Sequence, residues 1–334
     1  MNDPTSNPRL SVVIPTCRRP QLLGRCLDAL EAQTLPPAAY EIIVVDDGQS
    51  ADVRALCERR AASAAAKGLL IRYLRPFGTR GPAAARNRGW RAASGALIAF
   101  TDDDTFPDCE WLRQGEAAMQ PVRRLAVWGR VHVPLPAQMT DNARNTAGLE
   151  NAIFVTANVF VRRQALEAVG GFDERYLRAW REDTDLFFAL LGAGPWPGAV
   201  AKAQQALVLH PVREASFLVS IGQQANMTFD ALLYKKYPRL YDQYIGLRHP
   251  PLSYSVIVFA TLLALGVSAF WPRVSAASAI LALVLILRFA AQRLRGLARS
   301  PRQFFDMILS SFAIPYLSLY WRFVGALRWR TGFY

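Results

Sequence analysis

Gly95–Pro107, GALIAFTDDDTFP, is the stretch of sequence that decides the fold. It opens with a short apolar run, Leu97–Phe100, which is typical of a buried strand. The run stops at three consecutive aspartates, Asp102, Asp103 and Asp104. Adjacent carboxylates repel one another, but they become tolerable at the end of a strand if a divalent cation lies among them. From this segment alone, an acidic turn that faces water is an equally good interpretation.

Apolar runs alternate with helical patterns on the N-terminal side of this stretch. Strands are predicted over 10–14, 41–45 and 69–74, and helices over 21–33, 51–66 and 83–93. Strands that alternate with helices indicate βαβ units, so we predict an α/β fold with a largely parallel sheet flanked by helices. In such sheets ligands bind just beyond the carboxyl ends of the strands, which is where the three aspartates would lie.

The pattern continues beyond the aspartates. Strands are predicted over 125–133 and 156–161, and the segment 134–151 between them is predicted to be a polar loop. A helix is predicted over 184–191, with acidic residues in its first turn. The apolar run 206–209 then ends at His210.

Charge and cysteine content narrow the class of protein. The 334 residues carry a net charge of +13, which indicates an anionic partner. No nucleic-acid-binding signature accompanies this charge, so anionic lipid headgroups and phosphorylated substrates explain it better, and no nucleic-acid partner is expected. The four cysteines form no CxxC pair, which argues against a zinc site and fits a reducing cytoplasm. The N-terminus has no apolar segment of the kind that a secretory signal needs.

The C-terminal part is predicted to be a membrane region, residues 251–334. Leu252–Trp271 is twenty residues without a charge, enough to cross a bilayer, and a second helix over 274–292 reaches full length if Arg288 snorkels. The arginines between 288 and 302 would then be cytoplasmic by the positive-inside rule. The segment 303–325 suits an interfacial or re-entrant helix. The segment 218–250 suits amphipathic helices at the membrane boundary, with a lid that closes over the donor as the alternative. A buried helical hairpin in a soluble protein is the alternative.

A series of short segments carries a resemblance to a known family. LSVVIPTCRR, EIIVVDDG, GPAAARNRGW and ALIAFTDDD, followed by TANVFVRRQAL, AVGGFDERY, REDTDL and VLHPVREASF, resemble in order and spacing the family 2 glycosyltransferases. The resemblance covers roughly Leu10 to Phe217 and implies that residues 1–217 form a catalytic domain of the GT-A fold, which is Rossmann-like. It also implies a nucleotide-sugar donor, Mn²⁺ or Mg²⁺ as cofactor, and inversion at the anomeric carbon, in a membrane-anchored bacterial type of enzyme.

The resemblance assigns a donor and metal site. Asp104 would be the direct metal ligand, Asp102 would face the ribose or sugar and share the metal site, and His210 would complete it. Oxygen and imidazole ligands suit Mn²⁺. Asp46 or Asp47 would accept a hydrogen bond from the base, and Arg86 would approach the base or the phosphates. The other residues predicted beside the nucleotide are Pro15, Thr16, Arg19 and Asp103.

The resemblance also assigns the catalytic base and the acceptor pocket. Asp183 would take the proton of the acceptor hydroxyl, with Glu182 in support. A second catalytic acid is unnecessary, because a metal-bound diphosphate leaves without protonation. The simpler interpretation of the acidic residues is that they only cap the helix that follows. The sugar and acceptor pocket would be lined by Thr156, Ala157, Asn158, Trp180 and Arg181.

These features predict an inner-membrane, multi-pass enzyme that moves one sugar to a lipid-linked or membrane-proximal acceptor, with its catalytic domain in the cytoplasm. The QxxRW element of processive synthases has no match at Gln223–Met227, which argues against polymer synthesis. A polyprenyl-phosphate sugar synthase and a non-catalytic nucleotide-binding membrane scaffold are the alternatives. A dinucleotide-dependent oxidoreductase is disfavoured, because no GxGxxG follows the first strand.

Overall fold

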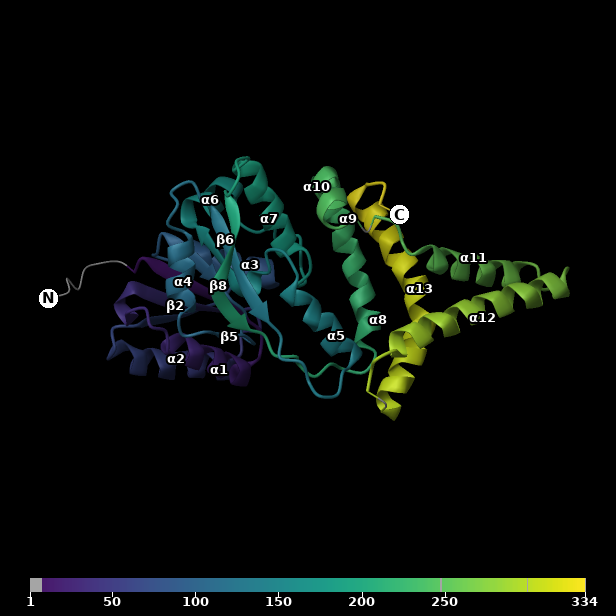
Figure 1. The fold of residues 1–334 in the computed structure, drawn as a ribbon, viewed down its shortest axis with the longest axis horizontal. Coiled ribbons are helices and arrows are strands. Elements are labelled where there is room, and N and C mark those ends of the chain that lie inside the picture. The colour runs from purple at the N-terminus through teal and green to yellow at the C-terminus, as the bar shows by residue number, and fades with distance from the viewer. Residues whose placement is uncertain (1–7, 247, 299, 334) are drawn as a thin grey trace. The chain divides into compact units, whose positions relative to one another are not determined.

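The computed structural model describes residues 8–246, 248–298 and 300–333 (Figure 1). The chain forms two compact units, which we call the sheet unit and the helical unit. The sheet unit comprises Met1–Pro134 and Thr146–Val212, and the helical unit comprises Leu135–Asn145 and Arg213–Tyr334. Of the predicted basic stretch, Arg299 lies outside the described residues.

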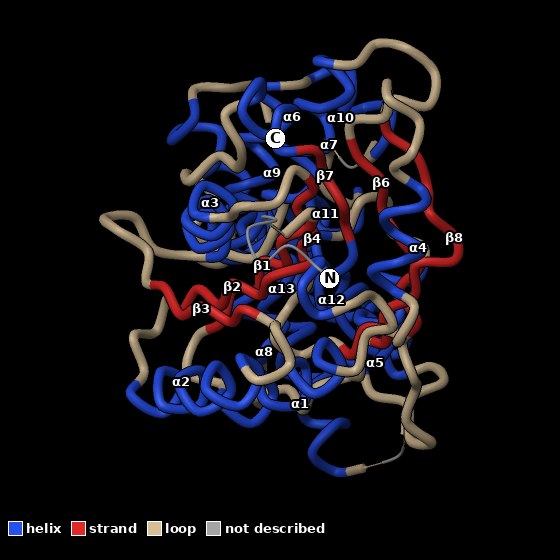
Figure 2. Tube along the Cα trace, turned by 90° about the vertical axis from the view of Figure 1, so that its left-hand side faces the viewer, coloured by secondary structure: helices blue, strands red, loops and turns tan. Residues whose placement is uncertain are grey.

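Within the described residues, eight strands form the single sheet of the sheet unit, in the order β3-β2-β1-β4-β7-β6-β8-β5 (Figure 2). They are β1 (Leu10–Thr16), β2 (Tyr40–Asp46), β3 (Leu70–Leu74), β4 (Leu97–Phe100), β5 (Phe106–Pro107), β6 (Ala126–His132), β7 (Val159–Arg162) and β8 (Val200–Leu209). The strands β1 to β4 pair with one another in parallel, as predicted. The sheet as a whole is mixed rather than largely parallel, because β7 runs antiparallel to both β4 and β6 and β5 runs antiparallel to β8.

Helices cover both faces of this sheet. They are α1 (Pro20–Glu31), α2 (Ala51–Ala65), α3 (Pro82–Ala92), α4 (Trp111–Ala118), α6 (Arg163–Val169) and α7 (Glu182–Ala193). Val12 and Ile14 of β1 belong to the buried cluster that includes the apolar residues of α1 and α2. Val13, which points to the opposite face, contacts α3 so closely that a Cβ on Gly89 would lie 2.3 Å from it. Both faces are therefore buried, as the continuous apolar strands require.

The pairing of β5 with β8 brings the aspartates and His210 together. Phe106 follows Asp104 by two residues and pairs with Leu209, which directly precedes His210. The strands β1, β4, β6 and β8 all run in the same direction, so their carboxyl ends lie at the same edge of the sheet. Segments a hundred residues apart in the sequence thus reach one place through a two-residue strand that sequence periodicity did not reveal.

The helical unit contains α8 (Val219–Gln223), α9 (Met227–Lys236), α10 (Pro238–Tyr244), α11 (Leu252–Gly266), α12 (Pro272–Leu294) and α13 (Pro301–Trp329). It also holds residues 135–145, and the helix α5 (Asp141–Ala147) begins there, inside the segment predicted to be a loop. We call residues 135–145 the excursion, and the guanidinium of Arg293 connects it to the helices by hydrogen bonds. It donates to Asp141 at 2.9 Å and to the hydroxyl groups of Ser220, Ser310 and Ser311.

The apolar helices differ from the predicted spans. Among the described residues, α12 and α13 are long and apolar enough to cross a membrane. The predicted span 252–271 forms a helix of only 15 residues, α11, which ends at Gly266. At 1.5 Å per residue this helix is about 22 Å long, less than the hydrocarbon thickness of about 30 Å. The predicted interfacial segment 303–325 lies within α13, a continuous helix of 29 residues that contains Pro315.

Replacing Arg293 with methionine should lower the stability of the helical unit. The variant leaves Asp141, whose side chain is 18% exposed, without its buried cation, at an expected cost of about 2–4 kcal/mol. Thermal unfolding of the detergent-solubilised full chain measures the effect. Arg288→Met, at an exposed position of the same helix, is the control. Equal melting temperatures for the two variants would contradict the assigned role of Arg293.

Candidate active site

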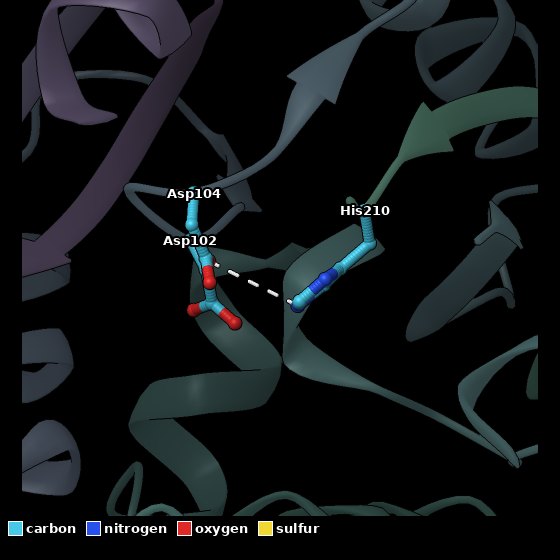
Figure 3. A group of neighbouring side chains, drawn as sticks. All are labelled: Asp102, Asp104 and His210. Carbon is cyan, nitrogen blue, oxygen red and sulfur yellow. Dashed lines mark ion pairs between the residues drawn. The ribbon is translucent and has the colours of Figure 1, made fainter. Parts of the chain in front are cut away.

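Asp102, Asp104 and His210 form one cluster at the carboxyl edge of the sheet (Figure 3). Each offers a ligand atom, and these atoms all lie within 4.8 Å of one another. His210 Nε2 lies 3.9 Å from Asp104 Oδ1, and both side chains are largely buried. The backbone N–H of His210 donates to the carbonyl of His132 at 2.8 Å, which fixes where the imidazole begins. The predicted metal ligands therefore converge.

The donor set of this cluster fits a divalent cation. Two ligand atoms that each lie about 2.1 Å from one ion are separated by at most about 4.2 Å, and the distance between His210 and Asp104 is within that limit. The Nδ1 atom of His210 is buried and has no hydrogen-bond partner within the described residues. Two carboxylates and an imidazole suit Mn²⁺. They suit Mg²⁺ less well, because Mg²⁺ prefers oxygen ligands to the imidazole nitrogen.

Asp103 points away from this cluster. Its Oδ2 accepts the hydroxyl proton of Thr16 at 2.7 Å, and its Oδ1 accepts from Arg19 at 3.0 Å. Burial raises the pKa of Asp103, and the charge of Arg19 and the hydrogen bond from Thr16 oppose that rise. Three of the predicted nucleotide-binding residues thus hold one another and join the end of β1 to the aspartate turn, while Pro15 lies in β1 beside them.

Two threonines that the sequence reasoning did not single out hold the turn in place. Thr105 donates to the carbonyl of Asp102 at 2.7 Å, and Thr101 donates to the carbonyl of Ala157 at 2.9 Å. Their hydroxyl groups are 2.7 Å apart. The signal was present in the sequence, because threonines that flank a polar turn commonly bond to the backbone around it.

Arg86 lies between the cluster of Asp102, Asp104 and His210 and the predicted base. It is 3% exposed, and its Nη2 donates to Asp102 at 2.7 Å while its Nη1 donates to Glu182 at 3.0 Å. The guanidinium lies over the ring of Phe172, 5.7 Å from the centroid. These contacts are with carboxylates, and the approach of Arg86 to the base or the phosphates of a donor, which the family resemblance implies, stays a prediction.

Glu182 and Asp183 begin α7, as the sequence predicts for acidic residues in a first helical turn. Asp183 accepts from the backbone N–H of Thr184 at 2.6 Å, and Arg181 precedes the helix with a left-handed φ of 73°. Burial raises the pKa of Glu182 to about 7, with the charge of Asp183 adding to the rise and Arg86 opposing it. Burial also raises the pKa of Asp183 above its ordinary value. Each carboxyl is therefore a better proton acceptor than an exposed one.

The two aspartates after β2 have different partners. Asp46 is fully buried and accepts from the backbone N–H groups of Gly48 and Ser50, and Tyr73 donates to it at 3.2 Å. Asp47 accepts from the N–H of Gly81 at 3.0 Å, and its Oδ1 is buried without a partner in the described part of the chain. Of the pair, Asp47 keeps an acceptor oxygen that the protein does not use.

The predicted acceptor-pocket residues separate into two groups. Thr156, Ala157 and Asn158 form a buried 3₁₀ turn, and the side chain of Asn158 is bonded to Trp111 and to the carbonyls of Arg130 and Ala206. These three support the site from within the core. Trp180 and Arg181 are partly buried, and the guanidinium lies 5.0 Å from the centroid of the tryptophan ring, just before the predicted base.

Comparison with known proteins supports this assignment of the fold. Residues 11–170 match the family model described as Glycosyl transferase family 2. The chain is 30% identical over 174 residues to the glycosyltransferase AglE of Haloferax volcanii, a match that covers 49% of this chain and 56% of AglE. It is 31% identical over 97 residues to the GalNAc(5)-diNAcBac-PP-undecaprenol beta-1,3-glucosyltransferase of Campylobacter jejuni, covering 29% of this chain and 30% of that protein.

A solved structure shares the fold over most of the chain. The mannosyltransferase PcManGT from Pyrobaculum calidifontis, solved in complex with GDP-Man and Mn²⁺, superposes with a TM-score of 0.56 at 18% identity. The superposition covers 95% of this chain and 89% of that structure. The sheet unit described above is therefore a glycosyltransferase family 2 domain with the GT-A fold.

Proposed function

We propose that this protein is a membrane-anchored, inverting glycosyltransferase that moves one sugar from a nucleotide-sugar to a lipid-linked acceptor. The observation that carries the proposal is the convergence of Asp102, Asp104 and His210 at one edge of the sheet, joined through Arg86 to Glu182 and Asp183. A cluster of possible metal ligands beside the carboxyls of Glu182 and Asp183 is what transfer from a metal-bound diphosphate requires.

The residues of the site divide the work of one displacement. Asp102, Asp104 and His210 would hold Mn²⁺ or Mg²⁺, which neutralises charge on the departing diphosphate. The acceptor oxygen attacks the anomeric carbon opposite the leaving group, the bond from that carbon to the diphosphate breaks, and the hydroxyl proton passes to Asp183. Attack from the opposite face inverts the configuration. Burial of Asp183 favours this step, because it raises the pKa of the carboxyl toward the working pH.

A nucleotide-sugar donor is supported by the relatives and by the free acceptor positions of the site. The neighbouring mannosyltransferase structure contains GDP-Man and Mn²⁺. In this chain Asp47 offers an unused oxygen to a base, while Thr16, Arg19 and Asp103 shape the turn beside it.

The helical unit supports attachment to a membrane. The hairpin of α11 and α12 exposes large apolar side chains, including Phe259 at 68%, Leu265 at 69% and Phe270 at 80%. Such a surface is unusual on a soluble monomer. We propose that this hairpin enters the inner membrane, that α13 lies at the boundary, and that the sheet unit faces the cytoplasm. Anionic lipids would neutralise the arginines that follow α12.

This attachment supports a lipid-linked acceptor, since an enzyme held at a membrane meets lipids in two dimensions. The name of the Campylobacter jejuni relative also specifies an undecaprenol-linked acceptor. A polyprenyl-phosphate sugar synthase is the second candidate. Its acceptor is already a phosphate anion and needs no general base, so Asp183 would have no proton to remove.

Mn²⁺ should raise the melting temperature of the wild-type protein, because an ion that binds only the folded state stabilises it. Asp104→Asn and His210→Ala should each lose most of this rise. Asp108→Asn, an exposed aspartate of the same segment, should keep it. A thermal-shift series with and without Mn²⁺ measures all four proteins. An undiminished rise in Asp104→Asn would refute the metal assignment.

Asp183→Asn should leave nucleotide-sugar binding nearly intact and lower transfer by about 100-fold or more, as for loss of a general base. The measurement is release of nucleoside diphosphate from whichever of UDP-glucose, UDP-GlcNAc and GDP-mannose raises the melting temperature most. Asp185→Asn is the matched control. Asp185 lies in the same helical turn as Asp183, and its carboxylate accepts a hydrogen bond from the hydroxyl of Tyr176. Unchanged turnover in Asp183→Asn would instead favour the polyprenyl-phosphate alternative.

The exposed thiols of Cys17 and Cys109 should report the side of the membrane. A membrane-impermeant maleimide should label them in inside-out vesicles and not in intact spheroplasts, because the sheet unit is proposed to face the cytoplasm. The Cys17→Ser/Cys109→Ser double variant should lose the label, since Cys26 and Cys57 are buried. Labelling in intact spheroplasts would place the catalytic unit on the other side.

A further inference from the structure

Arg86 contacts both acidic groups of the site, the aspartates after β4 and the carboxyls at the start of α7. Its Nη2 donates to Asp102 Oδ1 at 2.7 Å, and its Nη1 donates to Glu182 Oε1 at 3.0 Å. The guanidinium is almost fully buried, and Asp102 belongs to the cluster that includes Asp104 and His210. Glu182 directly precedes the proposed base. The guanidinium of Arg86 therefore connects the proposed metal-binding cluster to the carboxyls that include the proposed base.

The guanidinium is held rigidly in this place. Phe172, which lies beneath it, stacks edge-on against Phe100, the last residue of β4, with ring centroids 5.2 Å apart. The backbone N–H of Phe172 donates to Asn87 on the same helix as Arg86, and Asn87 donates back to its carbonyl. Since these contacts are buried, the core of the sheet unit helps to fix the position of Arg86.

The chemistry of the contacts requires arginine. A guanidinium presents two parallel pairs of N–H donors in a fixed plane, so it can bond two carboxylates at once. A lysine would keep the charge, but its single ammonium is a point charge without that planar fork. The charge of Arg86 also acts on both carboxyls at the start of α7, because it lowers the pKa of Glu182 and of Asp183 against the effect of burial.

We propose that Arg86 is a positioning residue that holds Asp102 and Glu182 in a fixed relation, so that the metal-binding end and the base end of the site are aligned for the same displacement. This role differs from a direct contact with the donor phosphates. It rests on the proposed glycosyltransferase activity and adds to it a residue that acts through its two carboxylate neighbours.

Three variants of the detergent-solubilised full chain test this role. Arg86→Lys keeps the charge and loses the bridge, Arg86→Gln loses both, and Arg91→Lys changes an arginine of the same helix whose side chain is 52% exposed. The probe is the nucleotide-sugar that raises the wild-type melting temperature most, with Mn²⁺. Its slow hydrolysis is followed by release of nucleoside diphosphate, so that water serves as acceptor and no lipid is needed.

The expected result separates geometry from charge. In Arg86→Lys the kcat should fall by about 100-fold, as for a small misplacement of a catalytic group, while the Kd of the nucleotide-sugar changes less than about threefold. The acid limb of its pH profile should stay near that of the wild type. In Arg86→Gln the same limb should move to higher pH by about one unit, because loss of a nearby cation raises the pKa of the carboxyls that must be ionised. Arg91→Lys should match the wild type in all three readouts.

A double-mutant cycle tests the path through Glu182. If Arg86 acts through Glu182, the loss of kcat in the double variant Arg86→Lys/Glu182→Gln should be smaller than the product of the two single losses. Losses that multiply would overturn the proposal, as would a rise in the nucleotide-sugar Kd of Arg86→Lys that equals its loss in kcat/KM. The second result would make Arg86 a donor ligand. A wild-type protein that binds and hydrolyses none of the three nucleotide-sugars would overturn the proposed function, and this inference with it.

Discussion

The constraint on which the site depends is the burial of negative charge at the end of β4. Three consecutive carboxylates leave a strand whose neighbours exclude water, and each has to be compensated by a different partner. Asp103 is compensated by Thr16 and Arg19, and Asp102 by Arg86. Asp104 faces the imidazole of His210, with Oδ1 3.9 Å from Nε2. Asp103 therefore turns away from the other two carboxylates, which converge with His210 in one cluster.

The same requirement explains why distant parts of the chain meet at this edge. Neutralising groups come from the end of β1, from the first turns of α3 and from the residue after β8. Parallel strands deliver the first two by ordinary βαβ connections. The third depends on the short β5, which pairs with β8 and places His210 beside the turn. Glu182 joins the set through Arg86, so the acidic start of α7 is connected to the end of β4 by one buried cation.

Much of the fold could be predicted from the sequence, because the strands β1, β2 and β4 are apolar runs bounded by polar turns. The cluster of Asp102, Asp104 and His210 was also predicted, but through family resemblance, since spacing alone could not bring a histidine to an aspartate 106 positions earlier in the chain. Three features were not predictable. The pairing of β5 is too short for periodicity, the partners of Arg86 lie far apart in the sequence, and the helical excursion at 141–147 is stabilised by Arg293, about 150 positions away.

The excursion of residues 135–145 limits how this protein can be shortened. Its Asp141 is paired with Arg293, and its Arg144 donates to the carbonyls of Arg293 and Arg295, which would otherwise end α12 unsatisfied. A polypeptide cut near residue 217, at the boundary that the sequence suggests, would keep the excursion and lose its contacts with Arg293 and Arg295. A buried acid and an extended polar loop would then project from between β6 and β7. Soluble expression of the catalytic part alone would therefore call for a redesigned connection across residues 135–145 as well as removal of the C-terminal helices.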